Sequence, residues 1–124
     1  MGSDQQDTSP MVTQLTTKLS EQQDGVWHLW LIGSIDSSNH HLMWSLDSAG
    51  ALLEKLVSAK ARKLIVDLTA LERLDSEGLR TLINTHKDFA ERNIEVVLQN
   101  PNPHLHRLLK LMRFDQLITI QIDD

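Results

Sequence analysis

Five segments of this 124-residue chain carry the hydrophobic and β-branched residues that are typical of strands. The first two segments are separated by the short polar stretch Gln22–Gly25, which predicts an antiparallel hairpin. In the third, Leu64, Ile65 and Val66 are consecutive, as expected for a central strand that is covered on both faces. The predicted strands are Met11–Leu19, Val26–Ile32, Lys63–Leu68, Ile94–Leu98 and Leu117–Ile120.

Three other segments repeat hydrophobic residues every three or four positions, which indicates helices with one buried side. Asp36, Ser37 and Ser38 can each cap the first of them. Gly50 lies inside that segment and costs about 1 kcal/mol relative to Ala, which allows a kink or break there. The predicted helices are Ser37–Ala59, Ser76–Arg92 and Leu105–Met112.

The order of these elements predicts the fold class. Two strands are followed by helix–strand units, and a helix that crosses between strands makes them parallel neighbours. We therefore expect an α/β fold with a mixed β-sheet of about five strands and helices packed mainly on one face. Residues 1–10 form a polar, flexible N-terminal lead in this interpretation, and residues 11–124 form one domain.

The second predicted strand has two hydrophobic faces. Alternation places Trp27, Leu29 and Leu31 on the face toward the core and places Trp30 and Ile32 on the opposite face. Two interpretations of the opposite face remain open. Trp30 packs against neighbouring parts of the chain, or the Trp30/Ile32 face supports a weak homodimer.

Composition and charge exclude several classes of function. Acidic residues outnumber basic ones 17 to 12, and the net charge of -5 argues against nucleic-acid binding. The chain has no cysteine, and its six histidines lack metal-ligand spacing, so we expect no metal site and no cofactor. Because no signal peptide or long hydrophobic run is present, we expect a cytoplasmic protein without direct membrane insertion.

The most informative segment is Asp75-Ser76-Glu77-Gly78, which leads directly into the second predicted helix. Asp75 is placed to cap that helix, and Ser76 is then its first residue, with the hydroxyl near solvent. Gly78 allows another backbone to approach the helix start. A helix N-terminus has free N–H groups and partial positive charge, so it accepts a phosphate of about -1.5 to -2 charge.

Two simpler interpretations of this segment are a helix cap alone and a hydrolase nucleophile. Asp75 and Ser76 can be a helix cap and nothing more, because both residue types are common there. A hydrolase nucleophile is disfavoured, since the Gly-x-Ser-x-Gly elbow needs Gly where Leu74 stands.

Three motifs resemble the STAS family, named for sulfate transporters and anti-sigma-factor antagonists. Gly33–Asp36 is similar to the family's Gly-x-x-Asp motif at the end of a strand. Ile65–Leu68, followed by Asp75–Leu79, is similar to the strand and the Asp-Ser/Thr-x-Gly-Leu switch. Asn100–Leu111, with Phe114 and Leu117, resembles the final helix and closing strand. The resemblance runs from about Val12 to Ile120 and covers nearly the whole chain.

The resemblance implies a bacterial signal-transduction protein that regulates transcription by partner switching and is not an enzyme. Unmodified Ser76 would permit binding to an anti-sigma factor, which is a serine kinase with the histidine-kinase-like ATPase fold. That kinase would phosphorylate Ser76 and end the binding, and a metal-dependent serine phosphatase would reset the protein. The partner-binding residues would be Asp36, Asp75, Glu77, Gly78 and Arg80.

One residue departs from the family pattern, and two alternatives stay open. Glu77 occupies a motif position that is usually small, which places a carboxylate beside the acceptor serine. Some STAS proteins are non-phosphorylated subunits of lipid-trafficking ABC transporters, and membership of this group is the first alternative for this chain. A small-ligand-binding protein is the other alternative, which a polar pocket with convergent groups would favour.

Overall fold

The computed structural model describes residues 14–123, except residues 37, 45 and 47. The predicted flexible lead, residues 1–10, and the start of the first predicted strand therefore lie outside the described residues. The strands are β2 (Leu15–Glu21), β3 (Val26–Ile35), β4 (Lys63–Asp67), β5 (Leu71–Leu74), β6 (Glu95–Gln99) and β7 (Thr119–Gln121). The helices are α1 (Ala49–Ser58), α2 (Ser76–Ala90) and α3 (Pro103–Leu111), with short 3-10 turns η2 (His40–Leu42) and η3 (Phe114–Gln116).

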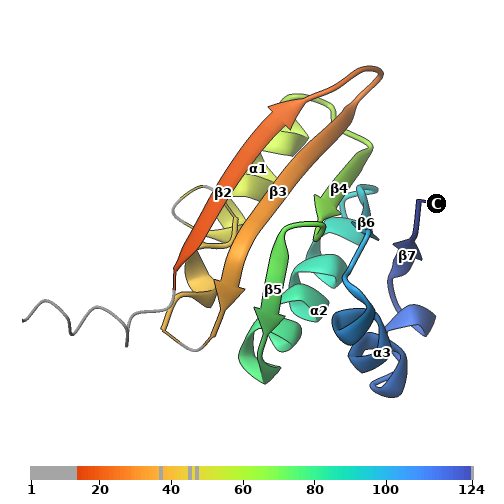
Figure 1. Ribbon diagram of the computed structural model, residues 1–124. Helices are drawn as coiled ribbons and strands as arrows, with labels where there is room; N and C mark the ends of the chain where they lie inside the picture. The colour runs from red at the N-terminus through yellow and green to blue at the C-terminus, as the bar shows by residue number, and fades with distance from the viewer. Residues whose placement is uncertain (1–13, 37, 45, 47, 124) are drawn as a thin grey trace, which may run out of the picture.

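The strands form one mixed sheet in the order β2-β3-β4-β6-β7, with β5 paired to β3 (Figure 1). β2 and β3 are antiparallel, as the hairpin prediction requires, and the remaining pairs are parallel. The α/β class and the mixed sheet are therefore confirmed. β5 is a sixth strand, in a segment for which the hydrophobic pattern predicts no strand.

The length of β3 explains where β5 lies. The first half of this ten-residue strand pairs with β4, and its last residues pair with β5, after an irregularity between Gly33 and Ser34. β5 therefore continues the sheet beyond the end of β4 and ends beside Ile35 of β3. This pairing brings the residue that follows β5 next to the end of β3.

A single hydrophobic core lies between the sheet and the helices. Trp27, Leu29 and Leu31 of β3 are buried in it, as predicted. The same cluster includes Leu56 of α1 and Phe89 of α2, as well as buried leucines of α3. All three helices therefore pack on one face of the sheet; Figure 1 shows α1 behind β2 and β3.

The first predicted helix, Ser37–Ala59, is wrong in its N-terminal half. Among the described residues, this region contains the η2 turn and then α1, which begins only at Ala49. Ser48 is the N-cap, and its side chain accepts the N–H of Ala51 at 3.1 Å. Leu42 and Leu46 lie before that cap at helical spacing from Ala49, so the hydrophobic pattern continues past the start of α1, although Leu42 belongs to η2 and is 51% exposed. The break falls at Ser48, ahead of Gly50.

The other predicted elements exist with small shifts of their ends. The second helix begins at Ser76 as predicted and ends at Ala90. The last strand starts at Thr119, because Leu117 closes the η3 turn. No helix in the described part of the chain is both long enough and hydrophobic enough to span a membrane.

The sheet face opposite the helices carries a stack of polar and aromatic side chains. The Trp30 ring stacks on the His28 ring with centroids 4.0 Å apart, and Lys18 Nζ lies 5.4 Å from the centre of Trp30. Trp30 therefore packs against neighbouring side chains, as one of the two interpretations required. Ile32 is 41% exposed. A weak homodimer through this face stays a prediction.

Asp67 anchors this stack at the end of β4. Its Oδ2 lies 2.9 Å from His28 Nε2, and its Oδ1 accepts the N–H of Thr69 at 2.9 Å. Burial alone would raise the pKa of Asp67, but hydrogen bonds from Thr69 and then from His28 outweigh it and hold the pKa below the ordinary value of 3.8. The ionised carboxylate thus holds the turn from β4 toward β5.

Leu56→Ala tests the core. Leu56 is fully buried, so we expect the free energy of unfolding to fall by about 2–5 kcal/mol in urea denaturation. Leu111→Ala is the matched control, because Leu111 is 74% exposed and its loss should change stability by less than about 0.5 kcal/mol. Equal effects of the two substitutions would contradict the described packing.

Asp67→Asn tests the anchor through pH. A carboxyl group whose pKa is lower in the folded state contributes stability above its unfolded-state pKa, and that contribution is lost as pH falls through the folded-state value. We therefore expect Asp67→Asn to be less stable than wild type near neutral pH, with the gap closing in acid below about pH 4. Urea unfolding at several pH values measures this gap, with the exposed Asp88→Asn as control. A gap that stays constant into acid would rule out the proposed cause.

Candidate functional site at the start of helix α2

Asp75 joins the end of β5 to the start of α2. Its backbone N–H donates to the carbonyl of Ile35 at 3.1 Å, which fixes this corner to the end of β3. Its side chain accepts the N–H of Gly78 at 3.0 Å, and its backbone is extended, as in an N-cap. The predicted cap is therefore confirmed, and α2 starts at one defined residue.

Ser76 is the first residue of α2, and it is exposed. The N–H groups of the first turn lie around this position, the Gly78 N–H among them being capped by Asp75, and the aligned peptide dipoles of a 15-residue helix make it electropositive. The hydroxyl therefore stands where a phosphate can be attached from solvent and then stabilised by the helix end.

Glu77 and Arg80 lie on the same first turns of α2. Arg80 Nη1 lies 3.5 Å from Glu77 Oε2, and both side chains reach solvent. At this exposure and distance the pair adds little to stability. Its effect is local, because the arginine offsets part of the negative charge that Glu77 places beside Ser76.

Gly78 is buried, and its neighbours differ from the sequence prediction. A Cβ at this position would overlap Cδ1 of Leu74 and lie 3.0 Å from Cγ2 of Ile35. The groups that approach Gly78 are thus side chains at the ends of β5 and β3, and the expected close approach of another backbone is wrong. The glycine lets the helix start lie directly on the strand ends.

The loop after β3 lies beside this corner. Gly33 has a φ of +110°, and a Cβ there would overlap the carbonyl oxygen of Gln14, so the position requires glycine. Asp36 Oδ1 accepts the N–H of Ser38 at 2.8 Å and its hydroxyl at 2.5 Å. The Asp36 N–H donates to Asn39 Oδ1 at 2.9 Å. Asp36 thus shapes the turn that follows β3.

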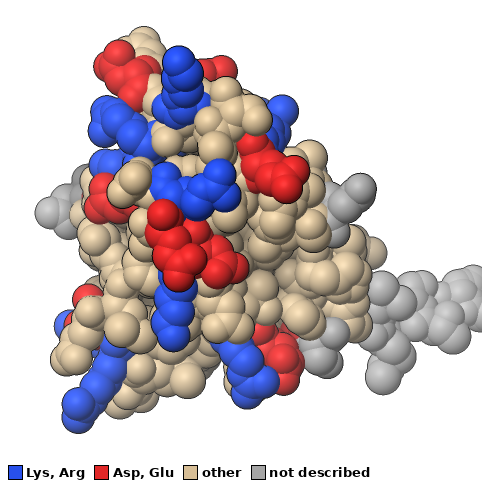
Figure 2. Space-filling model, turned by 180° about the vertical axis from the view of Figure 1, so that it is seen from behind, with Lys and Arg blue, Asp and Glu red and all other residues tan. Residues whose placement is uncertain are grey.

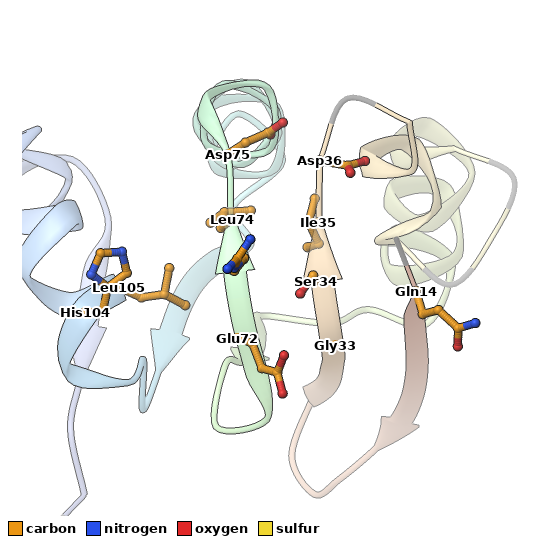
Figure 3. A pocket seen from close by; sticks show the side chains of 11 residues that line it. Gln14, Gly33, Ser34, Ile35, Asp36, Glu72, Leu74, Asp75, His104 and Leu105 are labelled. Carbon is orange, nitrogen blue, oxygen red and sulfur yellow. The ribbon is translucent and has the colours of Figure 1, made fainter. Parts of the chain in front are cut away.

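Asp36 and Asp75 border the same groove. It has a volume of about 1020 Å³ and is open to solvent. In Figure 3 the two carboxylates stand at the ends of neighbouring strands, on either side of the gap between them. The groove is also lined by Glu72 and Arg73 of β5 and by His104 of α3. The carboxylates of Asp36 and Asp75 accept backbone N–H groups, so their orientation is fixed by the fold.

The structure thus brings together all six predicted site residues. Asp36, Asp75 and Ser76 meet at one corner, with Glu77 and Arg80 beside them on α2 and Gly78 beneath. Sequence reasoning missed Glu72, Arg73 and His104, because they reach the groove only through the unrecognised β5 and through α3. No group of three or more metal-ligating side chains occurs among the described residues.

The surface charge around the fold is mixed. On the face seen in Figure 2, basic and acidic side chains are interspersed. A nucleic-acid interface needs a continuous basic stripe that neutralises phosphates, and that face does not offer one.

Comparison with known proteins relates this geometry to a family. A family model described as STAS domain matches residues 17–123. An anti-sigma factor antagonist from Mycobacterium paratuberculosis is 26% identical, with a TM-score of 0.66 over 87% of this chain and 86% of that chain. The phosphorylated form of the Bacillus cell fate determinant SpoIIAA has the same fold, with 12% identity and a TM-score of 0.63 over 85% and 90% of the two chains.

A sequence relative comes from a different kind of protein. Low affinity sulfate transporter 3 from Stylosanthes hamata is 27% identical over 73 residues, which are 59% of this chain. The chain spans 11% of the length of that transporter. The match therefore concerns one segment of the transporter.

Gly78→Ala tests the packing of the helix start. Alanine favours helices over glycine, yet the added methyl group must displace buried side chains, so we expect a loss of about 1–3 kcal/mol in the free energy of unfolding. Gly50→Ala in α1 is the matched control, because its Cβ would meet only Ser48 Oγ at 3.7 Å. Gly50→Ala should be neutral or stabilising by up to about 1 kcal/mol. Stabilisation by both substitutions would contradict the close packing at Gly78.

Proposed function

Because the chain belongs to the STAS domain family, we propose that it is a protein-binding module whose docking is switched by phosphorylation of Ser76. The single observation that carries the proposal is the position of this serine. It is the exposed first residue of α2, held there by the Asp75 cap. At this place a phosphate gains favourable interactions with the helix and changes the surface that a partner meets.

The docking surface in this proposal consists of Asp36, Asp75, Ser76, Glu77 and Arg80, with Gly78 beneath them. The five side chains come from the end of β3 and the start of α2, which the bond from the Asp75 N–H to the Ile35 carbonyl holds side by side. Gly78 contributes by packing, since it is buried. A partner shaped to this surface would lose contact when a dianion is added at its centre, because like charges and bulk are costly at an interface.

The partner is an anti-sigma factor that is itself a serine kinase of the histidine-kinase-like ATPase fold. It binds the unmodified chain and releases a sigma factor, then phosphorylates Ser76 and dissociates. A metal-dependent serine phosphatase restores the unmodified form. Similarity to an anti-sigma factor antagonist at 26% identity and the phosphorylated state of a protein with the same fold both support this cycle.

The chain acts in the cytoplasm by binding and not by catalysis. Two of the groove's carboxylates are committed to backbone N–H groups that shape the fold, which leaves them poorly placed as general acids or bases. The groove is broad and open, and a small-ligand carrier would enclose most of its ligand. The surface therefore favours a macromolecular partner.

Ser76→Ala and Ser76→Asp test the switch. Incubation with the cognate kinase and ATP, followed by mass spectrometry, should locate phosphate on Ser76 in wild type and none in Ser76→Ala. The matched control is Ser58→Ala, since Ser58 is an exposed serine at the C-terminal end of α1, outside the docking surface, and should leave phosphorylation intact. In a binding titration Ser76→Ala should bind persistently, whereas Ser76→Asp should bind at least about tenfold more weakly.

Two results would contradict the proposal. One is equal affinity of the partner for wild type and Ser76→Asp. The other is phosphate that remains on the chain when Ser76 is replaced by alanine. A protein that no kinase modifies would instead fit the alternative of a structural STAS subunit in a lipid-trafficking ABC transporter.

A further inference from the structure

His40 lies beside the docking surface, and neither the family motifs nor the sequence patterns assign it a role. It begins the η2 turn, and its Nδ1 lies 3.1 Å from the hydroxyl oxygen of Thr81 on α2. The His40 backbone N–H donates to the carbonyl of Asp36 at 2.9 Å. The histidine thus connects the turn that Asp36 shapes to the second turn of α2. We call Asp36 and residues 38–42 the docking loop.

The hydrogen bonds of Thr81 assign the proton on His40. The Thr81 hydroxyl donates to the carbonyl of Glu77 at 2.9 Å. A hydroxyl has only one proton, so toward His40 the Thr81 oxygen can only accept. Nδ1 of His40 must therefore carry a hydrogen and donate it. In neutral imidazole the other nitrogen is then an acceptor.

The other ring nitrogen of His40 belongs to a half-buried side chain. Nε2 has no hydrogen-bond partner among the described residues, and the buried side-chain nitrogens that lack a partner there are Trp27 Nε1 and His86 Nδ1. The neighbouring His41 ring meets His40 edge-on, with centroids 6.0 Å apart. In neutral His40 Nε2 is therefore an unprotonated acceptor beside the docking surface, suited to an Arg, Lys or amide donor on a partner.

We propose that His40 is a positioning residue, which holds the docking loop against α2 through Thr81 and presents Nε2 as a hydrogen-bond acceptor to the partner. Two hydrogen bonds then hold the end of β3 and its docking loop beside α2. One joins the Asp75 N–H to the Ile35 carbonyl, and the other joins His40 Nδ1 to the Thr81 hydroxyl. The role of His40 in docking rests on the proposed function. The proton on His40 Nδ1 and the hydrogen bond to Thr81 do not depend on it.

The first test reads the proton directly. A long-range ¹H–¹⁵N correlation spectrum of the histidine rings at a pH where His40 is neutral should show Nδ1 protonated and Nε2 unprotonated. Thr81→Val, which keeps the shape of the side chain and removes the hydroxyl, should abolish this preference, and Thr81→Ser should restore it. A neutral His40 that carries its proton on Nε2 in the wild type would overturn the assignment.

The second test measures how firmly the docking loop is held. Amide hydrogen exchange of residues 38–40 should become faster in Thr81→Val and return to the wild-type rate in Thr81→Ser. Asn84→Ala is the matched control, because Asn84 is exposed farther along α2, outside the docking loop, and should leave these rates unchanged. Unchanged exchange rates in Thr81→Val would contradict the claim that the His40–Thr81 hydrogen bond holds the docking loop against α2. Neither test needs a kinase or partner, so its failure is distinguishable from failure of the phosphorylation switch.

Discussion

The hydrogen bond from the Gly78 N–H to the Asp75 carboxylate determines where α2 begins, and the candidate site depends on that position. If the helix started one residue later, Ser76 would become the cap and its hydroxyl would turn toward the first-turn amides. With Asp75 as the cap, Ser76 is free at the surface while the amides around it stay electropositive. The same residue ties the helix to β3 through its backbone. The side chain and the backbone N–H of Asp75 thus fix the start of α2 beside the end of β3.

At this position a phosphate has different effects on the stability of the fold and on the binding of a partner. Added negative charge at the first residue of a helix is favourable or neutral for the helix itself, because it opposes the dipole. For a partner on the same surface, the charge is new and must be desolvated or repelled. A covalent phosphate at Ser76 can therefore alter binding and leave the sheet and core unchanged. The exposed Arg80 beside Glu77 limits the negative charge already present there.

Much of the fold was predictable, because its information is local in sequence. The helix α2, its Asp75 cap and its first residue follow from a cap residue before a periodic hydrophobic segment. The hairpin and the buried face of β3 follow from alternation and a short turn. β5 was missed because its inner residues, Glu72 and Arg73, are both exposed and break the alternation expected of a strand.

The remaining errors and omissions have non-local causes. The predicted helix from Ser37 was too long, because Leu42 and Leu46 continue the helical spacing of α1 beyond its Ser48 cap, while Leu42 lies in the η2 turn. The bond between His40 and Thr81 joins residues 41 positions apart. No spacing rule connects two such residues, and only the packing of η2 on α2 brings them together. The contact between the docking loop and α2 therefore became visible only in the structure.

The central claim is that the start of α2 accepts a dianion without loss of folding. The most direct test is the free energy of unfolding of the chain with phosphoserine installed at position 76, compared in urea with the unmodified chain. We expect the phosphorylated chain to be equally stable or more stable by up to about 1 kcal/mol, with a smaller difference at high salt. A loss of several kcal/mol would show that the phosphate disrupts the corner, and the separation of folding from docking would be contradicted.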